Sequence, residues 1–183
     1  KSADLQDVSS FDQETVGTSV RLGYVLAEDL RHNLRYTLQR DEISDVDANA
    51  SRFIKEQDGT TTTSSVAHSL VYDLRDNRIA PTEGFVIRFG QELAGFGGNV
   101  QFIKHTFDYG YFYPLGSGWG ASATIKEGHI LGLGQDVRIN NRFFLGGASL
   151  RGFESGGVGP RDLATGDSLG GNLFYSGTAD VSV

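Results

Sequence analysis

The sequence predicts an all-β protein, an antiparallel transmembrane β-barrel to which this chain contributes about seven strands. Three observations predict this fold. Apolar and polar residues alternate with a period of two over segments of about ten residues. Turn residues rich in glycine separate these segments. No run approaches the roughly 18 consecutive apolar residues that a membrane-spanning helix requires, which excludes a helical membrane protein.

Each predicted strand carries one apolar row and one polar row. In the segment 30–39, Leu34 and Tyr36 point one way, whereas Asn33 and Arg35 point the other. Because side chains alternate across a strand, the apolar row suits lipid and the polar row suits a water-filled interior. The predicted strands cover residues 19–26, 30–39, 66–74, 85–93, 100–113, 119–125 and 169–182.

Aromatic residues and loop lengths agree with this arrangement. Tyr109, Tyr111 and Tyr113 gather at one end of a predicted strand, as in the aromatic girdle at a membrane interface, and Trp119 falls in the same girdle. Short connections at 27–29, 75–84 and 115–118 alternate with long ones at 40–63 and 131–168. Both long loops therefore lie on one side of the predicted barrel, which is the outer side in this class.

A soluble β-sandwich is the alternative that alternation alone leaves open. Its strands are usually five or six residues long, and segments of about ten residues exceed that length. Repeatedly exposed Tyr and Phe side chains are also unusual on a soluble surface. Seven strands with one apolar outer face cannot close by themselves, so we expect further strands from outside this chain.

Composition excludes several other functions. A nucleic-acid partner is not expected, because 16 basic residues are scattered among 23 acidic ones and the net charge is −7. The absence of Cys removes disulfides and thiolate metal sites. No signal peptide precedes Lys1, and the chain stops at Val183 inside an alternating segment, so we expect that it is cut at both ends.

Catalytic candidates are few, and neither an enzyme nor a metal or cofactor site is predicted. The histidines His32, His68, His105 and His129 lie on separate predicted strands without a serine or metal-ligand spacing around them. His32 and His68 share the lipid-facing row; a neutral imidazole near the interface or under a partner is the ordinary explanation. The glycine-rich segment 95–99 lacks a following helix, so it predicts a hairpin loop rather than a nucleotide site.

The segment 142–162, R-F-F-L-G-G-A-S-L-R-G-F-E-S-G-G-V-G-P-R-D, carries the most specific motif. It resembles the sixth extracellular loop of the BamA family of outer-membrane assembly proteins. The family's hydrophobic-Arg-Gly-aromatic motif matches Leu150, Arg151, Gly152 and Phe153, flanked by Gly146, Gly147, Gly159 and Pro160. An Arg offers a rigid fork of donors to a carboxylate, and glycines at 146, 147, 152, 156 and 157 allow positive φ. The alternative is a flexible surface loop with an accidental Arg.

The segment 72–84, Y-D-L-R-D-N-R-I-A-P-T-E-G, is similar to a periplasmic turn of the same superfamily. The matching residues are Asp73, Arg75, Asp76, Pro81 and Gly84. Two interpretations stay open. The motif positions the barrel beside the periplasmic machinery, or its charges, Pro and Gly simply fix the backbone of the turn.

The resemblance implies a specific function. It implies an integral protein of the bacterial outer membrane that folds and inserts other outer-membrane proteins without ATP or a cofactor. Its partners would be unfolded client proteins, accessory lipoproteins and the lipid bilayer. A two-partner-type secretion pore, or a TamA-like barrel that exports specific clients, is the alternative.

The resemblance also implies how the whole protein is organised. Residues 1–183 would be part of one barrel domain and supply the sixth to twelfth of sixteen strands. The periplasmic POTRA repeats and the first and last barrel strands would lie outside this chain. In the family, the motif arginine, here Arg151, reaches into the lumen and pairs with acidic residues on strands that would follow Val183, and Phe153 would act as a hydrophobic plug beside it.

Overall fold

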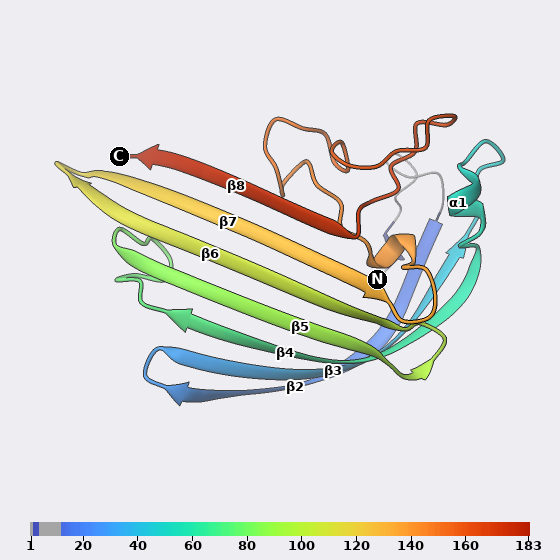
Figure 1. The fold of residues 1–183 in the computed structure, drawn as a ribbon, viewed down its shortest axis with the longest axis horizontal. Helices are drawn as coiled ribbons and strands as arrows, with labels where there is room; N and C mark the ends of the chain where they lie inside the picture. Colours follow the sequence, from blue (N-terminus) through green and yellow to red (C-terminus); the bar gives the residue numbers. More distant parts are fainter. Residues whose placement is uncertain (1, 4–11) are drawn as a thin grey trace.

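The computed structural model describes residues 2–3 and 12–183, which form one antiparallel sheet in which sequence neighbours pair (Figure 1). The sheet consists of β1 (Ser2–Ala3), β2 (Asp12–Ala27), β3 (Leu30–Ser44), β4 (Gly59–Asp73), β5 (Gly84–Gly98), β6 (Phe102–Gly116), β7 (Trp119–Gly132) and β8 (Leu173–Ser182). Two short helices, α1 (Arg52–Lys55) and a 3-10 helix (Ile139–Asn141), lie in the connections. The seven predicted strands are confirmed; β1 is an additional two-residue pairing.

Several strand ends differ from the prediction. Residues 40–44 and 59–63, predicted as loop, continue the β3–β4 ladder, with Arg40 opposite Thr62. Segment 95–99, predicted as a hairpin loop, mostly belongs to β5, which ends at Gly98; Gly95, Gly97 and Gly98 adopt positive φ in this last, irregular part of the strand. The last strand starts at Leu173 rather than at residue 169. These polar or glycine-rich stretches lack the alternation that marks a strand in a sequence.

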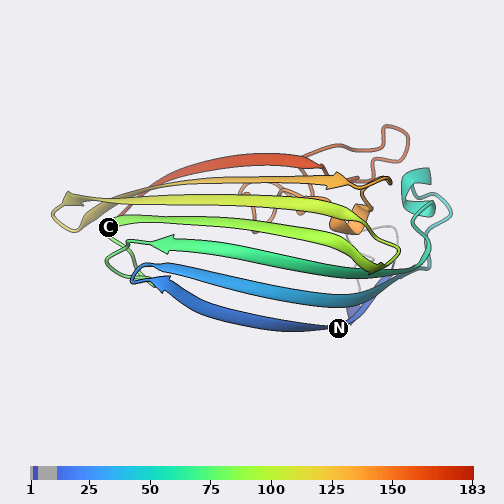
Figure 2. The same ribbon diagram turned by 60° about the horizontal axis from the view of Figure 1, so that its bottom comes forward.

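The predicted division between apolar and polar rows is confirmed by the register. Leu22 faces Leu34 across β2 and β3, and the polar row places Gly23 opposite Asn33. The apolar row is exposed, with Val20 69% and Ile125 52% accessible. Polar side chains and the loop 133–172 lie on the other face, which the curved strands partly enclose (Figure 2). We call these the outer and inner faces.

Turns and long loops separate to opposite ends of the strands, as predicted from their lengths. The connections 28–29, 74–83 and 117–118 lie at one end, and the loops 45–58 and 133–172 lie at the other (Figure 1). Within residues 2–3 and 12–183, the order of strands ends at β1 and β8, so the sheet stays open. No helix in the described ranges is long and apolar enough to cross a bilayer.

The buried core is small and lies at the long-loop end. One cluster joins Ile43 of β3 to Ile54 of α1 and to Ile139 of the 3-10 helix. The other contains Phe102 of β6 and Ile130 of β7, with Phe143 packed against it. Both clusters seat loop residues on strand residues, so the core fixes the loops rather than holding two layers together.

Candidate functional site

The loop 133–172 is docked on the inner face through Phe143. Its ring packs against Phe174 of β8, with ring centroids 4.8 Å apart. Space for both rings exists because residue 128 is glycine: a Cβ there would meet both of them. Lys104 of β6 lies over the ring, with Nζ 4.4 Å from the centroid, and donates a hydrogen bond to the carbonyl of Asn141 at 3.2 Å. Stacking and cation–π contacts thus fix the start of the loop to the wall.

Arg142 holds the two ends of the loop together. Its Nε donates to the carbonyl of Val137 at 3.0 Å, and one terminal nitrogen donates to the carbonyl of Leu169 at 3.2 Å. Phe143 and Gly171 form a backbone bridge beside this contact. Sequence analysis did not select Arg142 or Lys104, because an Arg or Lys gives no signal that its partners will be distant backbone carbonyls.

The outer part of the loop is tied to the other long loop by Ser51. The Ser51 hydroxyl donates a hydrogen bond to Asp162, and the Ser51 amide donates to Asp167 at 2.7 Å. The same hydroxyl accepts from the amide of Phe53 and so caps α1. The hydrogen bond from Ser51 holds the pKa of Asp162 below its usual value of 3.8. One serine therefore links the two long loops.

The predicted motif residues 150–153 form the tip of a tight turn. The amide of Gly147 donates to the carbonyl of Phe153 at 2.8 Å, which closes the turn. Gly146 has a φ of +129°, and a Cβ there would overlap the carbonyl oxygen of Glu154. Gly159 also has a positive φ, and Pro160 follows it with its carbonyl accepting from the amide of Leu169. Gly146 is thus needed for a close backbone approach, whereas Gly159 meets only the conformational requirement of a positive φ.

The side chains of Arg151 and Phe153 are not packed by the part of the chain that the structure describes. Arg151 is exposed and forms no hydrogen bond or ion pair within residues 2–3 and 12–183. Phe153 is 54% accessible, so the expected plug is not formed by these residues. We expected Gly157 at a positive φ, but its φ is ordinary. Glycine is required at this position for a steric reason, because a Cβ would lie 2.7 Å from the side chain of Glu154.

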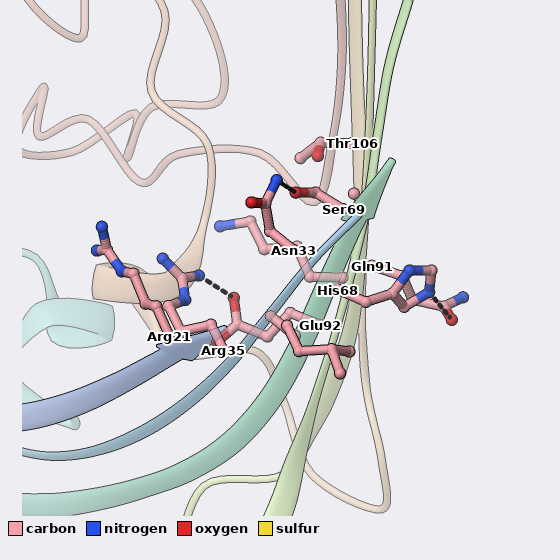
Figure 3. Close-up of a pocket in the computed structure, with 12 residues that line it drawn as sticks. Arg21, Asn33, Arg35, His68, Ser69, Gln91, Glu92 and Thr106 are labelled. Carbon is pink, nitrogen blue, oxygen red and sulfur yellow. Dashed lines mark hydrogen bonds and ion pairs between the residues drawn. The ribbon is translucent and has the colours of Figure 1, made fainter. Parts of the chain in front are cut away.

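The inner face below the loop has a hollow lined by polar and basic side chains from five strands (Figure 3). Arg21 of β2 stands directly opposite Arg35 of β3. Arg35 reaches Glu92 of β5 at 3.7 Å, and Glu92 accepts a hydrogen bond from Ser65 at 2.7 Å. With Lys104 included, three basic side chains and one carboxylate line the hollow. This part of the wall is therefore electropositive.

The turn motif lies at the opposite end of the strands from the loop. Arg75 forms a two-pronged ion pair with Asp73, with nitrogen–oxygen distances of 2.8 and 2.9 Å. Gly84 has a φ of +99°, and a Cβ there would overlap the Leu74 carbonyl. Pro81 is half-buried in the turn. These residues are brought together, but the motif does not approach Arg151.

Asp76 organises the remainder of the turn. Its carboxylate accepts hydrogen bonds from the hydroxyl of Thr82 at 2.6 Å and from the amides of Thr82 and Glu83 at 2.9 and 3.0 Å. These bonds, the Thr82 hydroxyl foremost, lower the pKa of Asp76 well below its usual range. The hydrogen bonds of these charged side chains stay within the turn, and the Arg75 guanidinium also lies over the ring of Phe112 on β6, 6.0 Å from its centroid. These contacts favour the interpretation that the charged residues fix the turn on the sheet.

The four histidines lie on separate strands, as predicted, on β3, β4, β6 and β7. Across the described ranges, no group of three or more His, Asp or Glu side chains is arranged to hold a metal ion. The strand register nevertheless brings histidines into contact on the outer face, which the sequence pattern did not reveal.

An open antiparallel sheet with an exposed apolar outer face, a polar inner wall and a long inward loop defines the class of transmembrane β-barrel proteins. The model of the Omp85 superfamily domain matches residues 1–183. The chain belongs to this superfamily, and the expected membership of the BamA family within it is confirmed. Its location is accordingly the bacterial outer membrane, as an integral protein.

Individual relatives agree with this assignment. The chain is 41% identical to the outer membrane protein assembly factor BamA of Neorickettsia risticii, over 92% of this chain and 23% of that protein. It is 32% identical to the sorting and assembly machinery component 50 homolog of Xenopus tropicalis, over 92% of this chain and 36% of that protein. The chain thus spans about a quarter to just over a third of these relatives.

A solved structure shows the same fold. The crystal structure of BamA from Haemophilus ducreyi lacking POTRA domains 1–3 matches with a TM-score of 0.82 and 18% identity. The match covers 93% of this chain and 37% of that chain. The open sheet described above therefore has the same fold as about a third of that chain.

Proposed function

We propose that the protein containing this chain is an outer-membrane assembly factor that folds and inserts other outer-membrane β-barrel proteins. The observation that carries this proposal is the docked loop 133–172, which presents the motif residues 150–153 above the inner wall. Relatives named as assembly proteins in bacteria and in animals, matched over nearly the whole chain, support it. The proposed work is physical, without ATP, a cofactor or a catalytic residue.

Arg151 is the proposed anchor of the loop. A guanidinium with no partner among the residues described is suited to a carboxylate on strands beyond this chain, which it can engage with two parallel hydrogen bonds. Gly146, Gly147, Gly159 and Pro160 would shape the turn that presents it, and Leu150, Gly152 and Phe153 would complete the contact with the opposite wall. Such an anchor would hold the barrel in its working conformation.

The remaining parts of the proposal concern organisation and partners. Residues 1–183 would form part of one barrel domain, with POTRA repeats and the first and last strands elsewhere in the protein. Unfolded outer-membrane proteins are the proposed clients, and accessory lipoproteins are proposed partners. For Asp73, Arg75, Asp76, Pro81 and Gly84 we propose a structural role, because the hydrogen bonds of the charged residues stay within the turn and the Arg75 guanidinium otherwise contacts the neighbouring strand β6.

Depletion of the full-length protein in its own cells tests the function. We expect general loss of folded porins and accumulation of their unfolded precursors in the periplasm. Normal porins together with loss of one exported protein would contradict the proposal and would instead identify a secretion pore or a TamA-like exporter.

Arg151→Ala tests the anchor. We expect folded porin levels to fall markedly while synthesis of the variant continues, because the loop loses its ionic contact. Arg151→Lys should restore only part of the activity, since Lys keeps the charge but lacks the planar fork. Leu163→Ala, at a fully exposed position of the same loop, is the matched control. Unchanged porin levels and unchanged heat-modifiability in Arg151→Ala would refute the anchor.

A further inference from the structure

All four histidines of the chain lie in one row across the outer face, together with a tyrosine and a glutamine. We call this row the histidine lane; it consists of Tyr24, His32, His68, Gln91, His105 and His129. Register pairs Tyr24 with His32, His68 with Gln91, Gln91 with His105 and His105 with His129. The rings of His32 and His68 meet edge to face, with centroids 5.4 Å apart. The lane therefore crosses six successive strands without a gap.

Hydrogen bonds connect the members of the lane. The hydroxyl of Tyr24 is 2.6 Å from Nδ1 of His32. The Gln91 side chain bridges two histidines: its Oε1 lies 3.4 Å from Nε2 of His68, and its Nε2 lies 3.1 Å from Nδ1 of His105. With the Gln91 amide in this orientation, its oxygen only accepts and its nitrogen only donates, so both contacts require a proton on Nε2 of His68 and none on Nδ1 of His105.

These bonds leave the lane unsatisfied. Nδ1 of His68 is buried without a partner among the residues described. A neutral His105 that accepts at Nδ1 carries its proton on Nε2, which finds no acceptor within residues 2–3 and 12–183. Figure 3 shows His68 and Gln91 on the opposite side of the sheet from Arg21 and Glu92, so inner-face charges do not satisfy them.

Hydrocarbon cannot supply the missing hydrogen bonds. Leu34, Val66 and Leu70 surround the lane on the same face. Polar groups at membrane depth are costly and usually have a partner in a functional site. The lane thus needs a partner that carries both polar groups and apolar chains.

A hollow of about 420 Å³ on the outer face marks where such a partner fits. His32, His68 and Gln91 supply its polar side chains, whereas Leu93 and Phe96 are among its apolar ones. This combination suits a phosphate or ester group on the polar residues with acyl chains along the apolar ones. The carboxylate of Glu127 lies on the same face, two residues before His129, and disfavours phosphate at that end of the lane.

Position along the strands identifies the leaflet. His32 follows the start of β3 at Leu30 by two residues, and His68 precedes the end of β4 at Asp73 by five. Both strand ends join short turns, which outer-membrane barrels place on the periplasmic side. His32 and His68 therefore lie in the periplasmic half of their strands, whereas Gln91 lies at the middle of β5, seven residues from either end; the two histidines place the polar end of the hollow toward the periplasmic leaflet.

We propose that the His32–His68–Gln91 part of the lane is a binding site for the phosphate-containing headgroup of a periplasmic-leaflet phospholipid. The second N–H of the Gln91 amide and the Nε2 side of His32 would donate to the phosphate, and the acyl chains would lie along Leu34, Val66 and Leu93. The site is independent of the proposed function, because it rests only on the outer face of β3–β5 and its register with β6.

The test uses the full-length protein in nanodiscs of phosphatidylethanolamine and phosphatidylglycerol. Phospholipid that stays bound after transfer to detergent is counted by native mass spectrometry. We expect the double variant His68→Leu, Gln91→Leu to bind phospholipid about tenfold more weakly, the effect of losing one hydrogen bond to a charged group. His129→Leu, the same change on the same face but outside the hollow, should bind as the native protein does. Equal retention in all three proteins, or equal loss in both variants, would overturn the proposal.

A second measurement does not depend on the folding of the double variant. A photoreactive residue replaces Leu34 at the edge of the hollow, with the lane itself unchanged. We expect adducts with phospholipid after illumination in native membranes. Adducts with a protein would show that a protein partner covers the lane, and adducts with lipopolysaccharide would place the hollow in the other leaflet. Either result would refute a periplasmic-leaflet phospholipid as the occupant.

Discussion

At the scale of single residues, two glycines with similar backbone conformations sit in very different surroundings. Gly84 has a φ of +99° and Gly118 a φ of +85°. A Cβ at Gly84 would overlap the carbonyl of Leu74, whereas nothing lies within 4 Å of a Cβ at Gly118. At Gly84, a side chain is therefore excluded both by the positive φ and by the lack of space for a Cβ. At Gly118, only the positive φ disfavours a side chain.

This difference predicts unequal costs of substitution. Gly84→Ala should destabilise the folded protein by about 1–3 kcal/mol from backbone strain together with displacement of the turn, and Gly118→Ala should cost clearly less. Urea unfolding of the full-length protein in lipid vesicles measures both. Equal losses would mean that the Leu74 contact relaxes without cost.

The hydrogen bond between Ser51 and Asp162 predicts a pH dependence of loop docking. The folded-state pKa of Asp162 is depressed, so the bond stabilises the docked loop fully above the ordinary pKa of 3.8 and is lost as pH falls through the lower folded-state pKa. We expect hydrogen exchange around Ser51 to be slow at neutral pH and to accelerate, relative to the intrinsic rate, in strong acid. In Asp162→Asn this acceleration should disappear. Acceleration of the same size in Asp162→Asn would assign the effect to another group.

At the scale of elements, the docking of the loop 133–172 depends on one missing side chain. A methyl group at Gly128 would meet the rings of Phe143 and Phe174, whereas at Gly120, on the same strand and face, the nearest atom is 3.9 Å away. We expect Gly128→Ala to release the loop and cost about 1–3 kcal/mol by overpacking. Gly120→Ala should have little effect.

Limited proteolysis of the full-length protein in membranes reports this release. The expected result is rapid cleavage within residues 133–172 of Gly128→Ala only. Resistance equal to that of the native protein would show that Phe143 does not hold the loop, and would leave Arg142 as its main attachment.

Much of this element-scale structure could be predicted from the sequence, and the reason for the remainder is physical. The strands were predicted because successive side chains of a strand point to opposite faces, so the alternation of apolar and polar residues can be read from neighbouring positions in the sequence. The extension of β3 to Ser44 was missed because its outer residues are polar, and the docking of Phe143 was missed because it depends on a glycine distant in sequence. The Arg151 motif was predicted from resemblance, but its partner remains a prediction.

At the scale of the whole molecule, the two faces of the sheet differ in their surroundings. Neighbouring residues in the middle of β7 test this difference: Ile125 is outward and 52% accessible, and Thr124 is inward. Ile125→Arg should destabilise the protein by about 2–4 kcal/mol because the charge meets lipid, whereas Thr124→Arg should be tolerated in water. Urea unfolding in vesicles compares them; a larger loss for Thr124→Arg would reverse the assignment of faces.

The histidine lane belongs to the same scale, because it appears only when six strands are in register. Each histidine taken alone is an ordinary interfacial residue. The alternation of side chains along the strands shows only that His32 and His68 share a face, not that the histidines of different strands meet. The lane depends on the offsets between strands, such as Gln91 against His105, which are set by turn geometry and loop length rather than by residue type.

The opposed pair Arg21 and Arg35 has an electrical consequence for the water inside the wall. Like charges directly across two strands repel each other, and Glu92 offsets only part of their field. Small anions are therefore concentrated along this stretch relative to cations, within about a Debye length of 10 Å at moderate salt.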